Sequence, residues 1–293
     1  MITDYSHLTA AAADLLSTPD DKRVRAIKSR RWVLYPRAKQ TLDHLNRLIN
    51  HPRGTRMPSI AIYGDSGMGK TMIMERFRDD NPPGFDAVSG RERTPVLAME
   101  MAGKPGERRF YGELLALLGA PPSPRADIVQ MEQAALRLLS AVGLQVLVID
   151  EVHNILAGSH CDQRVVLNTL RFLSNRLQIS LVCFGVMDAR EAISGDVQLA
   201  RRFEEFSINR WAANEQFETL VSSILRNTPL RRPTVLTPKS LRRILQVTEG
   251  ITANIFHMIN GLAADAAQSG QERITDEGIE SWRPLSDRGA AFA

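Results

Sequence analysis

Cysteine is scarce in this chain of 293 residues, which contains only Cys161 and Cys183. The two residues do not have the spacing of metal ligands, and Cys183 lies in an apolar run. We therefore expect reduced thiols, with Cys183 buried. Glycine and proline are also few, with 19 and 15 residues, and this excludes a low-complexity polymer.

Long apolar runs are missing as well. No run approaches the ~18 residues that a membrane-spanning helix needs. The first residues, Met1-Ile-Thr-Asp-Tyr-Ser-His, lack the positive patch and apolar stretch of a secretory signal. The composition, with 43% hydrophobic and 24% charged residues, is typical of one large globular domain or two small ones. We therefore expect a cytoplasmic protein without a membrane partner.

The formal net charge of +4 is unevenly distributed. Residues 1–50 and residues 201–250 each contain nine Lys/Arg and five Asp/Glu, so the rest of the chain sums to −4. Such basic zones can bind phosphates, but they can equally be solvated helix faces or subunit contacts. The basic residues concentrate at 22–31 and at Arg201, Arg202, Arg231, Arg232, Arg242 and Arg243.

The apolar pattern predicts an α/β layer followed by helices. Expected strands at 59–63, 96–100, 146–149, 179–184 and 206–208 alternate with helices at 38–49, 72–78, 110–118, 127–141 and 164–176. This alternation predicts a parallel sheet flanked by helices. A polar, proline-rich break is expected at 81–94, and from residue 214 every expected element is a helix. We therefore expect a basic N-terminal segment (1–35), an α/β domain (36–212), a helical lid (213–283) and a tail (284–293).

One motif carries most of the chemistry. The expected strand at 59–63 runs into Gly64-Asp-Ser-Gly-Met-Gly-Lys-Thr71, and a helix follows. This is a complete phosphate-binding loop in its strand-to-helix context. Its glycines let backbone N–H groups surround the phosphates, Lys70 adds a charge, and the Thr71 hydroxyl is suited to Mg²⁺. The expected nucleotide-binding residues of the loop are Gly64, Asp65, Ser66, Gly67, Met68, Gly69, Lys70 and Thr71.

Two adjacent carboxylates follow a later aliphatic strand. Asp150 is positioned to hold Mg²⁺ through water, and Glu151 is positioned to orient or deprotonate an attacking water. The Asn-Lys-x-Asp pattern that reads guanine is absent, which favours ATP. We therefore predict ATP hydrolysis with Mg²⁺ held by Thr71 and Asp150. A structural, salt-bridged Glu151 is the alternative.

The segment Asp150-Glu-Val-His153 also matches the D-E-x-H motif of a class of helicases. A helicase needs a second ATPase-like α/β domain after this motif, whereas only 140 residues follow His153 and most of them are expected to be helical. We therefore prefer to interpret His153 as a residue that links the active site to a neighbouring element.

Two further segments concern sensing and subunit communication. The strand at 179–184 ends in Gly185 and Val186, where many related ATPases carry a polar residue that senses the γ-phosphate, and Asp188 is a weak substitute. Arg202, with Arg201 as second choice, lies where ring-forming ATPases place an arginine that reaches the neighbouring subunit's phosphate. Surface arginines without such a role are the alternative.

A combination of short segments resembles a known family. These are Arg31-Trp32 with Tyr35-Pro36, Arg56-Met57-Pro58, the phosphate loop, Asp150-Glu-Val-His-Asn154 and Gln198-Leu-Ala-Arg-Arg-Phe203. In this order they resemble the TniB family of AAA+ transposition proteins, related to TnsC, over about residues 25–265. The resemblance implies an AAA+ P-loop ATPase fold. It also implies an ATP-dependent regulator that polymerises on duplex DNA, marks a target, and recruits a DDE transposase with a TniQ-like adaptor.

The resemblance also assigns roles to residues. The nucleotide roles carry over to Lys70, Thr71, Asp150 and Glu151. The role of the arginine that reaches the neighbouring subunit's phosphate carries over to Arg202. Trp32 and Tyr35 match the segment that borders adenine in such ATPases, although each is equally consistent with a core aromatic. The lid segment at 250–254 lacks the arginine of many AAA+ lids, so we expect slow hydrolysis.

For DNA, we expect Lys104, Arg108 and Arg109, in the loop after the strand at 96–100, to bind phosphates without reading sequence. They would face the axis of a ring or helical filament of identical subunits. Two other functions remain open. A helicase loader of the DnaC or IstB kind would prefer single strands, and a non-catalytic scaffold would use ATP only to join subunits.

Overall fold

The computed structural model describes residues 5–87 and 90–283. The expected tail at 284–293 lies outside these residues. The described residues fall into two compact units, which we treat separately. The sheet unit comprises residues 40–66 and 70–208, and the helical unit comprises residues 5–39, 67–69 and 209–283.

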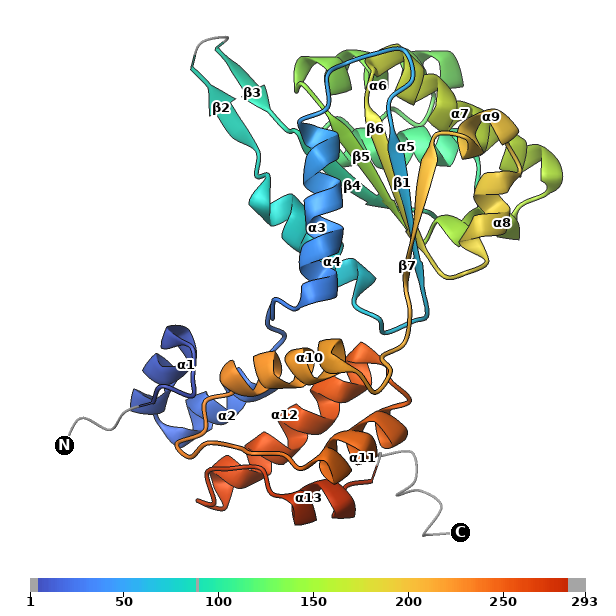
Figure 1. Ribbon diagram of the computed structural model, residues 1–293. Coiled ribbons are helices and arrows are strands. Elements are labelled where there is room, and N and C mark those ends of the chain that lie inside the picture. The colour runs from blue at the N-terminus through green and yellow to red at the C-terminus, as the bar shows by residue number, and fades with distance from the viewer. Residues whose placement is uncertain (1–4, 88–89, 284–293) are drawn as a thin grey trace. The chain divides into compact units, whose positions relative to one another are not determined.

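A parallel sheet organises the sheet unit (Figure 1). Within the described residues it has five strands in the order β4-β5-β6-β1-β7, and every neighbouring pair is parallel. The bounds are β1 (Ser59–Gly64), β4 (Val96–Glu100), β5 (Val146–Asp150), β6 (Ser180–Gly185) and β7 (Phe203–Ile208). This confirms the predicted parallel sheet, with β7 beginning earlier than expected.

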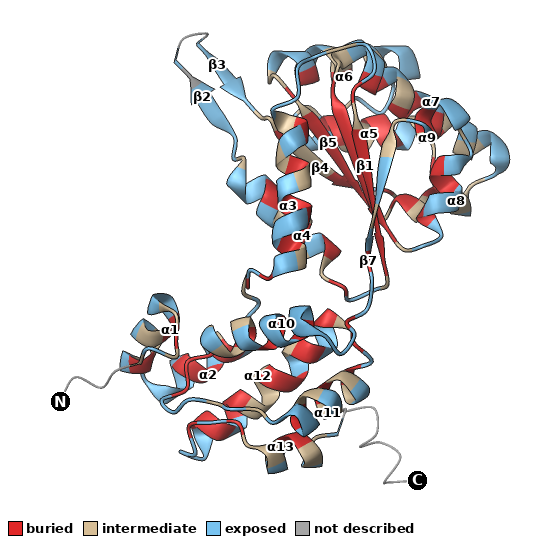
Figure 2. Cartoon of the chain, in the orientation of Figure 1, coloured by how far each residue is buried: buried red, intermediate tan, exposed pale blue. Residues whose placement is uncertain are grey.

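Burial explains why the inner strands have almost no polar residues. Every residue of β1, β5 and β6 is buried, as expected for strands covered on both faces. Figure 2 shows this buried material concentrated in the sheet and on the helix sides that face it. The covering helices are α3 (Pro36–Ile49), α4 (Lys70–Asp80), α5 (Glu107–Leu117), α6 (Ile128–Ala141), α7 (His160–Leu177), α8 (Ala189–Ser194) and α9 (Val197–Ala200).

The helical unit is built around α12 (Thr252–Gln268), whose long apolar face packs against α2, α10 and α11. Side chains cap the surrounding helices: Asn214 begins α10 (Glu215–Arg226), Thr237 begins α11 (Pro238–Thr248), and Thr275 begins α13 (Asp276–Ser281). These four helices match the predicted helical run. The N-terminal segment adds α1 (Ala10–Asp14), a short 3₁₀ turn η1 (Leu15–Ser17) and α2 (Asp20–Lys28).

A buried ion pair attaches α2 to the rest of the helical unit. The guanidinium of Arg23 is fully buried and donates to both carboxylate oxygens of Glu272, at 2.7 and 2.6 Å. Arg231 also donates to Glu272 at 2.9 Å, and Asp20 accepts a further bond from Arg23. Burial by itself would raise the pKa of Glu272, but hydrogen bonds from Arg23 and Arg231 outweigh it and hold the pKa below its ordinary value.

Two regions differ from the sequence prediction. The expected break at 81–94 contains an antiparallel hairpin of β2 (Gly84–Asp86) and β3 (Arg91–Arg93). Its strands are three residues long and lack the apolar alternation that predicts a strand. The helix α2 was also not predicted. Its apolar residues are few, and its partners lie more than two hundred residues later.

The two cysteines differ in burial, and the helices differ from membrane-spanning helices. Cys183 is buried, which confirms the prediction, whereas Cys161 is exposed. Burial raises the pKa of the Cys183 thiol far above its ordinary value. Among the helices of residues 5–87 and 90–283, none combines the length and apolar character needed to cross a bilayer.

Candidate nucleotide-binding site

The phosphate loop joins β1 to α4, as the sequence predicted, and its glycines are sterically required. Gly67 and Gly69 have φ values of 76° and 91°, in the left-handed region that side chains disfavour. A Cβ at Gly64 would lie 2.7 Å from the backbone oxygen of Ile208 in the neighbouring β7. A Cβ at Gly69 would lie 3.4 Å from the hydroxyl of Tyr35. Glycine is therefore needed at Gly64 by close packing and at Gly67 and Gly69 by backbone conformation, as in a loop whose N–H groups face a phosphate.

Lys70 is the first residue of α4, and its ammonium lies under the loop. The Nζ atom donates to the carbonyl oxygens of Gly64 at 2.7 Å and Asp65 at 3.0 Å. Burial lowers the pKa of Lys70, while the charges of Glu151, Asp150 and Asp65 act in the opposite direction. The site thus places a nearly buried amine where a phosphate oxygen would gain most from a positive charge.

Thr71, in the first turn of α4, contacts Asp150, at the end of β5, although the two residues are far apart in sequence. Asp150 ends β5, and its Oδ2 accepts a hydrogen bond from the Thr71 hydroxyl at 3.2 Å. Its Oδ1 accepts the N–H of Glu151 at 2.9 Å. A hydroxyl beside one carboxylate suits Mg²⁺, which keeps several waters and takes further ligands from phosphates. The described residues contain no cluster of three or more His, Cys, Asp or Glu that would hold a metal by themselves.

Glu151 adopts a left-handed conformation, with φ 52°, which is unusual for a non-glycine residue. Its Oε2 lies 3.2 Å from Nδ1 of His153. This contact is an ionic one if the ring is protonated, and its geometry is not that of a good hydrogen bond. Asn154, on the following 3₁₀ turn η2 (Val152–Ala157), donates to the Met101 carbonyl at 2.8 Å. The Asp-Glu-Val-His-Asn segment therefore connects the carboxylates to the loop after β4.

The end of β6 offers no polar side chain at the position usual for sensing a phosphate. A Cβ at Gly185 would lie 2.5 Å from the Cβ of Ala189, so packing against α8 excludes any side chain there. Val186 follows, and Asp188 is exposed at the start of α8 without capping it. The structure places these three residues but gives none of them a partner that points to sensing.

The two predicted adenine-side residues lie in the helical unit. Tyr35 is buried, its ring stacks edge-on with Trp211 at 5.5 Å, and burial raises its pKa to about 12. Trp32 is half-exposed. The guanidinium of Arg37 lies 4.3 Å from the centre of the Trp211 ring. Sequence reasoning missed Trp211, because an isolated aromatic at an expected domain boundary carries no motif.

The lid segment at 250–254 also lies close to the loop within the helical unit. The N–H of Ala253, in the first turn of α12, donates to the Gly67 carbonyl at 2.9 Å. Trp211 fixes the same segment, because its Nε1 donates to Thr252 at 2.9 Å and its N–H donates to Gly250 at 2.9 Å. These hydrogen bonds hold the 250–254 segment against Gly67 and Trp211.

Arg202 lies where the strands of the sheet begin, whereas the phosphate loop lies where they end. Its carbonyl accepts the N–H of Ser59, the first residue of β1, whereas the loop starts at Gly64, the last residue. At about 3.3 Å per residue, β1 separates them by roughly 16 Å. Arg202 therefore does not serve the loop of its own chain.

The predicted DNA-binding residues have different surroundings. Lys104 lies in the exposed loop after β4. Arg108 and Arg109, expected in that loop, instead form the first turn of α5, which begins at Glu107 because Gly106 precedes a helix-favouring run. Arg108 donates to the carbonyls of Ala126 and Pro124, and Arg109 pairs with Glu113 at 2.9 Å.

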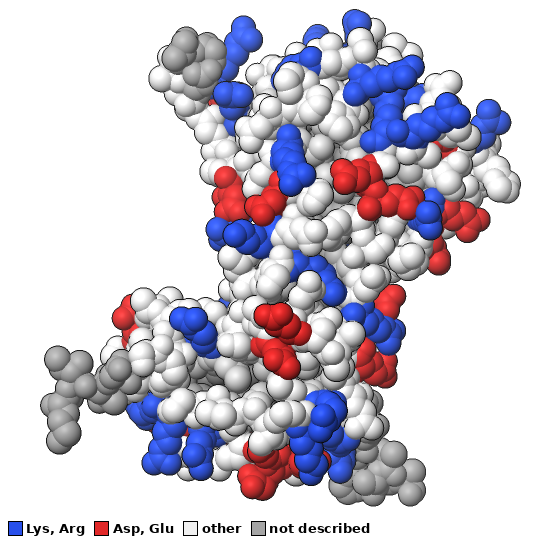
Figure 3. All heavy atoms as spheres, in the orientation of Figure 1, with Lys and Arg blue, Asp and Glu red and all other residues white. Residues whose placement is uncertain are grey.

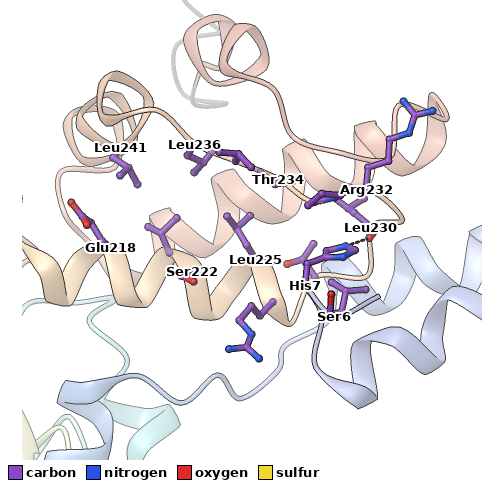
Figure 4. Close-up of a pocket in the computed structure, with 16 residues that line it drawn as sticks. Ser6, His7, Glu218, Ser222, Leu225, Leu230, Arg232, Thr234, Leu236 and Leu241 are labelled. Carbon is purple, nitrogen blue, oxygen red and sulfur yellow. Dashed lines mark hydrogen bonds between the residues drawn. The ribbon is translucent and has the colours of Figure 1, made fainter. Parts of the chain in front are cut away.

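A separate cavity of about 560 Å³ lies among α10, the 228–236 segment and the N-terminal residues (Figure 4). Leu225, Leu230 and Leu241 line it, and His7 closes one side through a 3.0 Å hydrogen bond to the Leu230 carbonyl. None of the predicted site residues lines this cavity, so it is not the nucleotide site.

The strand order, the phosphate loop after β1 and the added helices define the fold of an AAA+ P-loop ATPase. An ORC1 protein of Aeropyrum pernix, solved in complex with DNA, has a TM-score of 0.59 at 15% identity, covering 88% of this chain and 68% of that one. Cdc6p of Pyrobaculum aerophilum has a TM-score of 0.60 at 17% sequence identity, and the match covers 87% of this chain and 68% of that one. Drosophila ORC bound to DNA has a TM-score of 0.59 at 13% sequence identity, and the match covers 90% of this chain and 65% of that one. The chain thus spans about two thirds of these relatives, and the likeness concerns the fold alone.

The sequence comparison is more specific. Residues 23–213 match the family described as bacterial TniB protein, and the chain belongs to that family. A comparison with curated proteins finds no match. Family membership confirms the resemblance drawn from the short motifs.

Proposed function

We propose that this protein is an ATP-dependent, DNA-binding regulator of DNA transposition. In this proposal the ATP-bound form assembles as a homo-oligomer on duplex DNA without sequence preference, marks the target, and recruits or activates a DDE transposase with a TniQ-like adaptor. Residues 36–212 act as the ATPase domain and residues 213–283 as its lid.

One observation carries the nucleotide part of the proposal. Lys70, Thr71 and Asp150 lie at the same edge of the sheet, in contact with the loop or with each other, although the hydroxyl and carboxylate are 79 residues apart. These groups match the phosphate and Mg²⁺ chemistry of ATP. Membership of the TniB family supports a role in transposition, and two proteins of similar fold were solved with DNA.

The experiment is fluorescence anisotropy of a labelled random-sequence duplex titrated with protein under ATP, ADP and no nucleotide. We expect affinity at least tenfold higher with ATP, and loss of this gain in Lys70→Ala, because the phosphates lose their buried cation. Lys239→Ala is the matched control, since this lysine is exposed and paired with Glu280. Equal binding in all three states would contradict the proposal, and preference for a single-stranded probe would favour the helicase-loader alternative.

Hydrolysis is tested separately with Glu151→Gln. If Glu151 positions the attacking water, this variant assembles on DNA with ATP but turns over at least a hundredfold more slowly, as expected for loss of a general base. Wild type and variant hydrolysing equally slowly, while both assemble, would support a scaffold that uses ATP only as a structural ligand.

A further inference from the structure

The segments that lead into the strands of the parallel sheet contain arginine but no acidic residue. Parallel strands all begin at the same end of a sheet, so the segments before them are brought together there. The segments are 50–58 before β1, 93–95 before β4, 142–145 before β5, 176–179 before β6 and 201–202 before β7. The strand-ending side of the sheet, which carries the phosphate loop and the Asp-Glu pair, does not use these residues.

Hydrogen bonds hold these segments side by side. The N–H of Ser59 donates to the Arg202 carbonyl at 3.0 Å, which joins the start of β1 to the start of β7. The guanidinium of Arg53 donates to the Leu144 carbonyl at 3.2 Å, which joins the segment before β1 to the segment before β5. Figure 3 shows lysine and arginine side chains along this end of the sheet unit, near α6, α7 and the start of β7.

The exposed arginines of these segments keep their positive charge. Arg56, Arg93, Arg176 and Arg201 are exposed, and within residues 5–87 and 90–283 their side chains make no hydrogen bond or ion pair. Arg53 is also exposed, and its acceptor is an uncharged carbonyl. We call these five residues the strand-start arginines.

Acidic residues that flank the segments in sequence do not cancel this charge. Asp196 is already paired with Arg171, at 2.9 Å. Glu92 precedes the segment before β4, and because side chains alternate along a strand it lies on the other face of its hairpin from the arginine that follows it. Glu204, within β7, lies 3.9 Å from His44 of α3. The end of the sheet where the strands begin therefore has a net positive surface.

The size and composition of this surface suit the backbone of duplex DNA. Neighbouring strands lie about 4.8 Å apart, so five strand starts span roughly 19 Å. A duplex carries one negative charge per about 1.7 Å of its axis, so it presents on the order of ten phosphates over this length. Proteins that prefer single strands add aromatic side chains on which bases stack, and the five segments contain no aromatic residue except His51.

We propose that the strand-start arginines form a second DNA-binding surface, which holds the phosphate backbone of duplex DNA without reading sequence and without requiring ATP. The surface lies at the other end of the strands from the phosphate loop. It goes beyond the proposed function, because neither the ATP site nor Lys104 contributes to it. Arginine suits this contact, since its planar guanidinium can donate two parallel hydrogen bonds to a phosphate.

The first test measures anisotropy of a labelled random-sequence duplex without nucleotide, between ~50 and ~200 mM salt, a range in which phosphate contacts dominate. Arg56→Glu with Arg176→Glu should weaken binding at least tenfold and lower the slope of log K against log salt by about two. The matched control, Arg242→Glu with Arg273→Glu, changes the net charge equally at exposed arginines of the helical unit and should stay within threefold of wild type.

Two milder pairs of variants keep this test decisive. Arg56→Lys with Arg176→Lys retains both charges, so we expect affinity within threefold of wild type and an unchanged salt slope. Arg56→Gln with Arg176→Gln replaces the charge-reversal pair if circular dichroism shows that the latter does not fold, and should weaken binding at least threefold with the same loss of slope. Binding by the Gln pair that equals wild type would overturn the inference.

Repeating the titration with ATP separates this surface from the ATP site. The Arg56→Glu, Arg176→Glu pair should keep the gain in affinity that ATP gives, whereas Lys70→Ala should lose the gain and keep the nucleotide-free binding. If the charge-reversal pair binds like its control, or weakens only a single-stranded probe, the inference is wrong and the proposed function is untouched.

Assembly provides the last discrimination. Sedimentation with ATP and without DNA should show the same oligomer for wild type and for the charge-reversal pair. If the pair fails to assemble while its nucleotide-free DNA binding is unchanged, the strand-start arginines are a subunit contact and the inference is overturned. If wild type shows no gain with ATP but the pair still weakens nucleotide-free binding, the inference stands and the proposed function fails.

Discussion

At the scale of single residues, the phosphate loop depends on the absence of a Cβ atom at its glycines. Gly67 and Gly69 need the left-handed backbone, whereas Gly64 has another reason to lack a side chain. It is the last residue of β1 and faces the Ile208 carbonyl of β7 at a distance that no Cβ tolerates. The start of the loop is therefore fixed by the packing of two strands.

We expect Gly64→Ala to destabilise the protein by about 1–3 kcal/mol, because β1 and β7 must separate to admit the methyl group. Urea unfolding followed by circular dichroism measures the change. Gly54→Ala is the control, since a Cβ there meets nothing within 4 Å. Equal stability of the two variants would show that the strands accommodate the methyl group without cost.

At the scale of elements, the attachment of α2 is the least expected feature. Its apolar residues are few, yet it packs along α12 because Arg23 and Glu272 form a bidentate pair in the interior. Removing one member of such a pair leaves an uncompensated buried charge. The N-terminal segment is therefore held by electrostatics and hydrogen bonds as much as by apolar packing.

We expect Glu272→Ala to cost about 3–5 kcal/mol at pH 7, because Arg23 loses its buried partner. The matched control is Glu249→Ala, which also removes a glutamate of positive φ but from the exposed pair with Arg210, and should cost below about 1 kcal/mol. Chemical denaturation monitored by tryptophan fluorescence gives both values. A loss no larger than that of the control would contradict the importance of the pair.

The same pair makes a prediction about pH. Because the folded-state pKa of Glu272 lies below its ordinary value of 4.5, the stability it contributes is present above that value. It is lost as pH falls through the lower folded-state pKa. The difference in unfolding free energy between wild type and Glu272→Ala should therefore be constant from pH 7 to about pH 5 and shrink below it. A difference that grows on acidification would have the wrong sign.

At the scale of the whole molecule, the phosphate loop and Arg202 lie at opposite ends of the strands in the sheet unit. The phosphate loop lies at the carboxyl ends of the strands, and Arg202 with Arg56 lies where they begin. In the proposed assembly on DNA, the exposed Lys104 would be repeated along the duplex.

Among the three predicted DNA residues, Lys104 should matter most, because Arg108 and Arg109 already bond within the chain. We expect Lys104→Ala to weaken duplex binding and reduce the slope of log K against log salt concentration by about one per subunit contact. Arg109→Ala, whose side chain pairs with Glu113, serves as comparison and should change the slope less. Binding titrations between 50 and 200 mM salt, a range in which phosphate contacts dominate, decide the point. An unchanged slope for Lys104→Ala would place the DNA elsewhere.

Local patterns determined much of this protein. The glycine spacing of the loop, the aliphatic strands at 59–63 and 146–149 and the helices after residue 214 are visible in sequence, because each depends on neighbouring residues. The hairpin at 84–93 and α2 were not predictable in this way. Their residues lack a periodic apolar face, and for α2 the stabilising partner is Glu272, which is 249 positions from Arg23.

What only the tertiary structure decided is which distant groups meet. The sequence by itself determined a phosphate loop, an Asp-Glu pair after a buried strand and membership of a recognisable family. The order of the strands then brought Asp150 to Thr71, and the packing of α7 gave Arg202 a hydrogen bond to Asn175. The physical reason is that sequence periodicity reports which residues face a core, whereas charge and hydrogen-bond partners depend on which elements pack against one another.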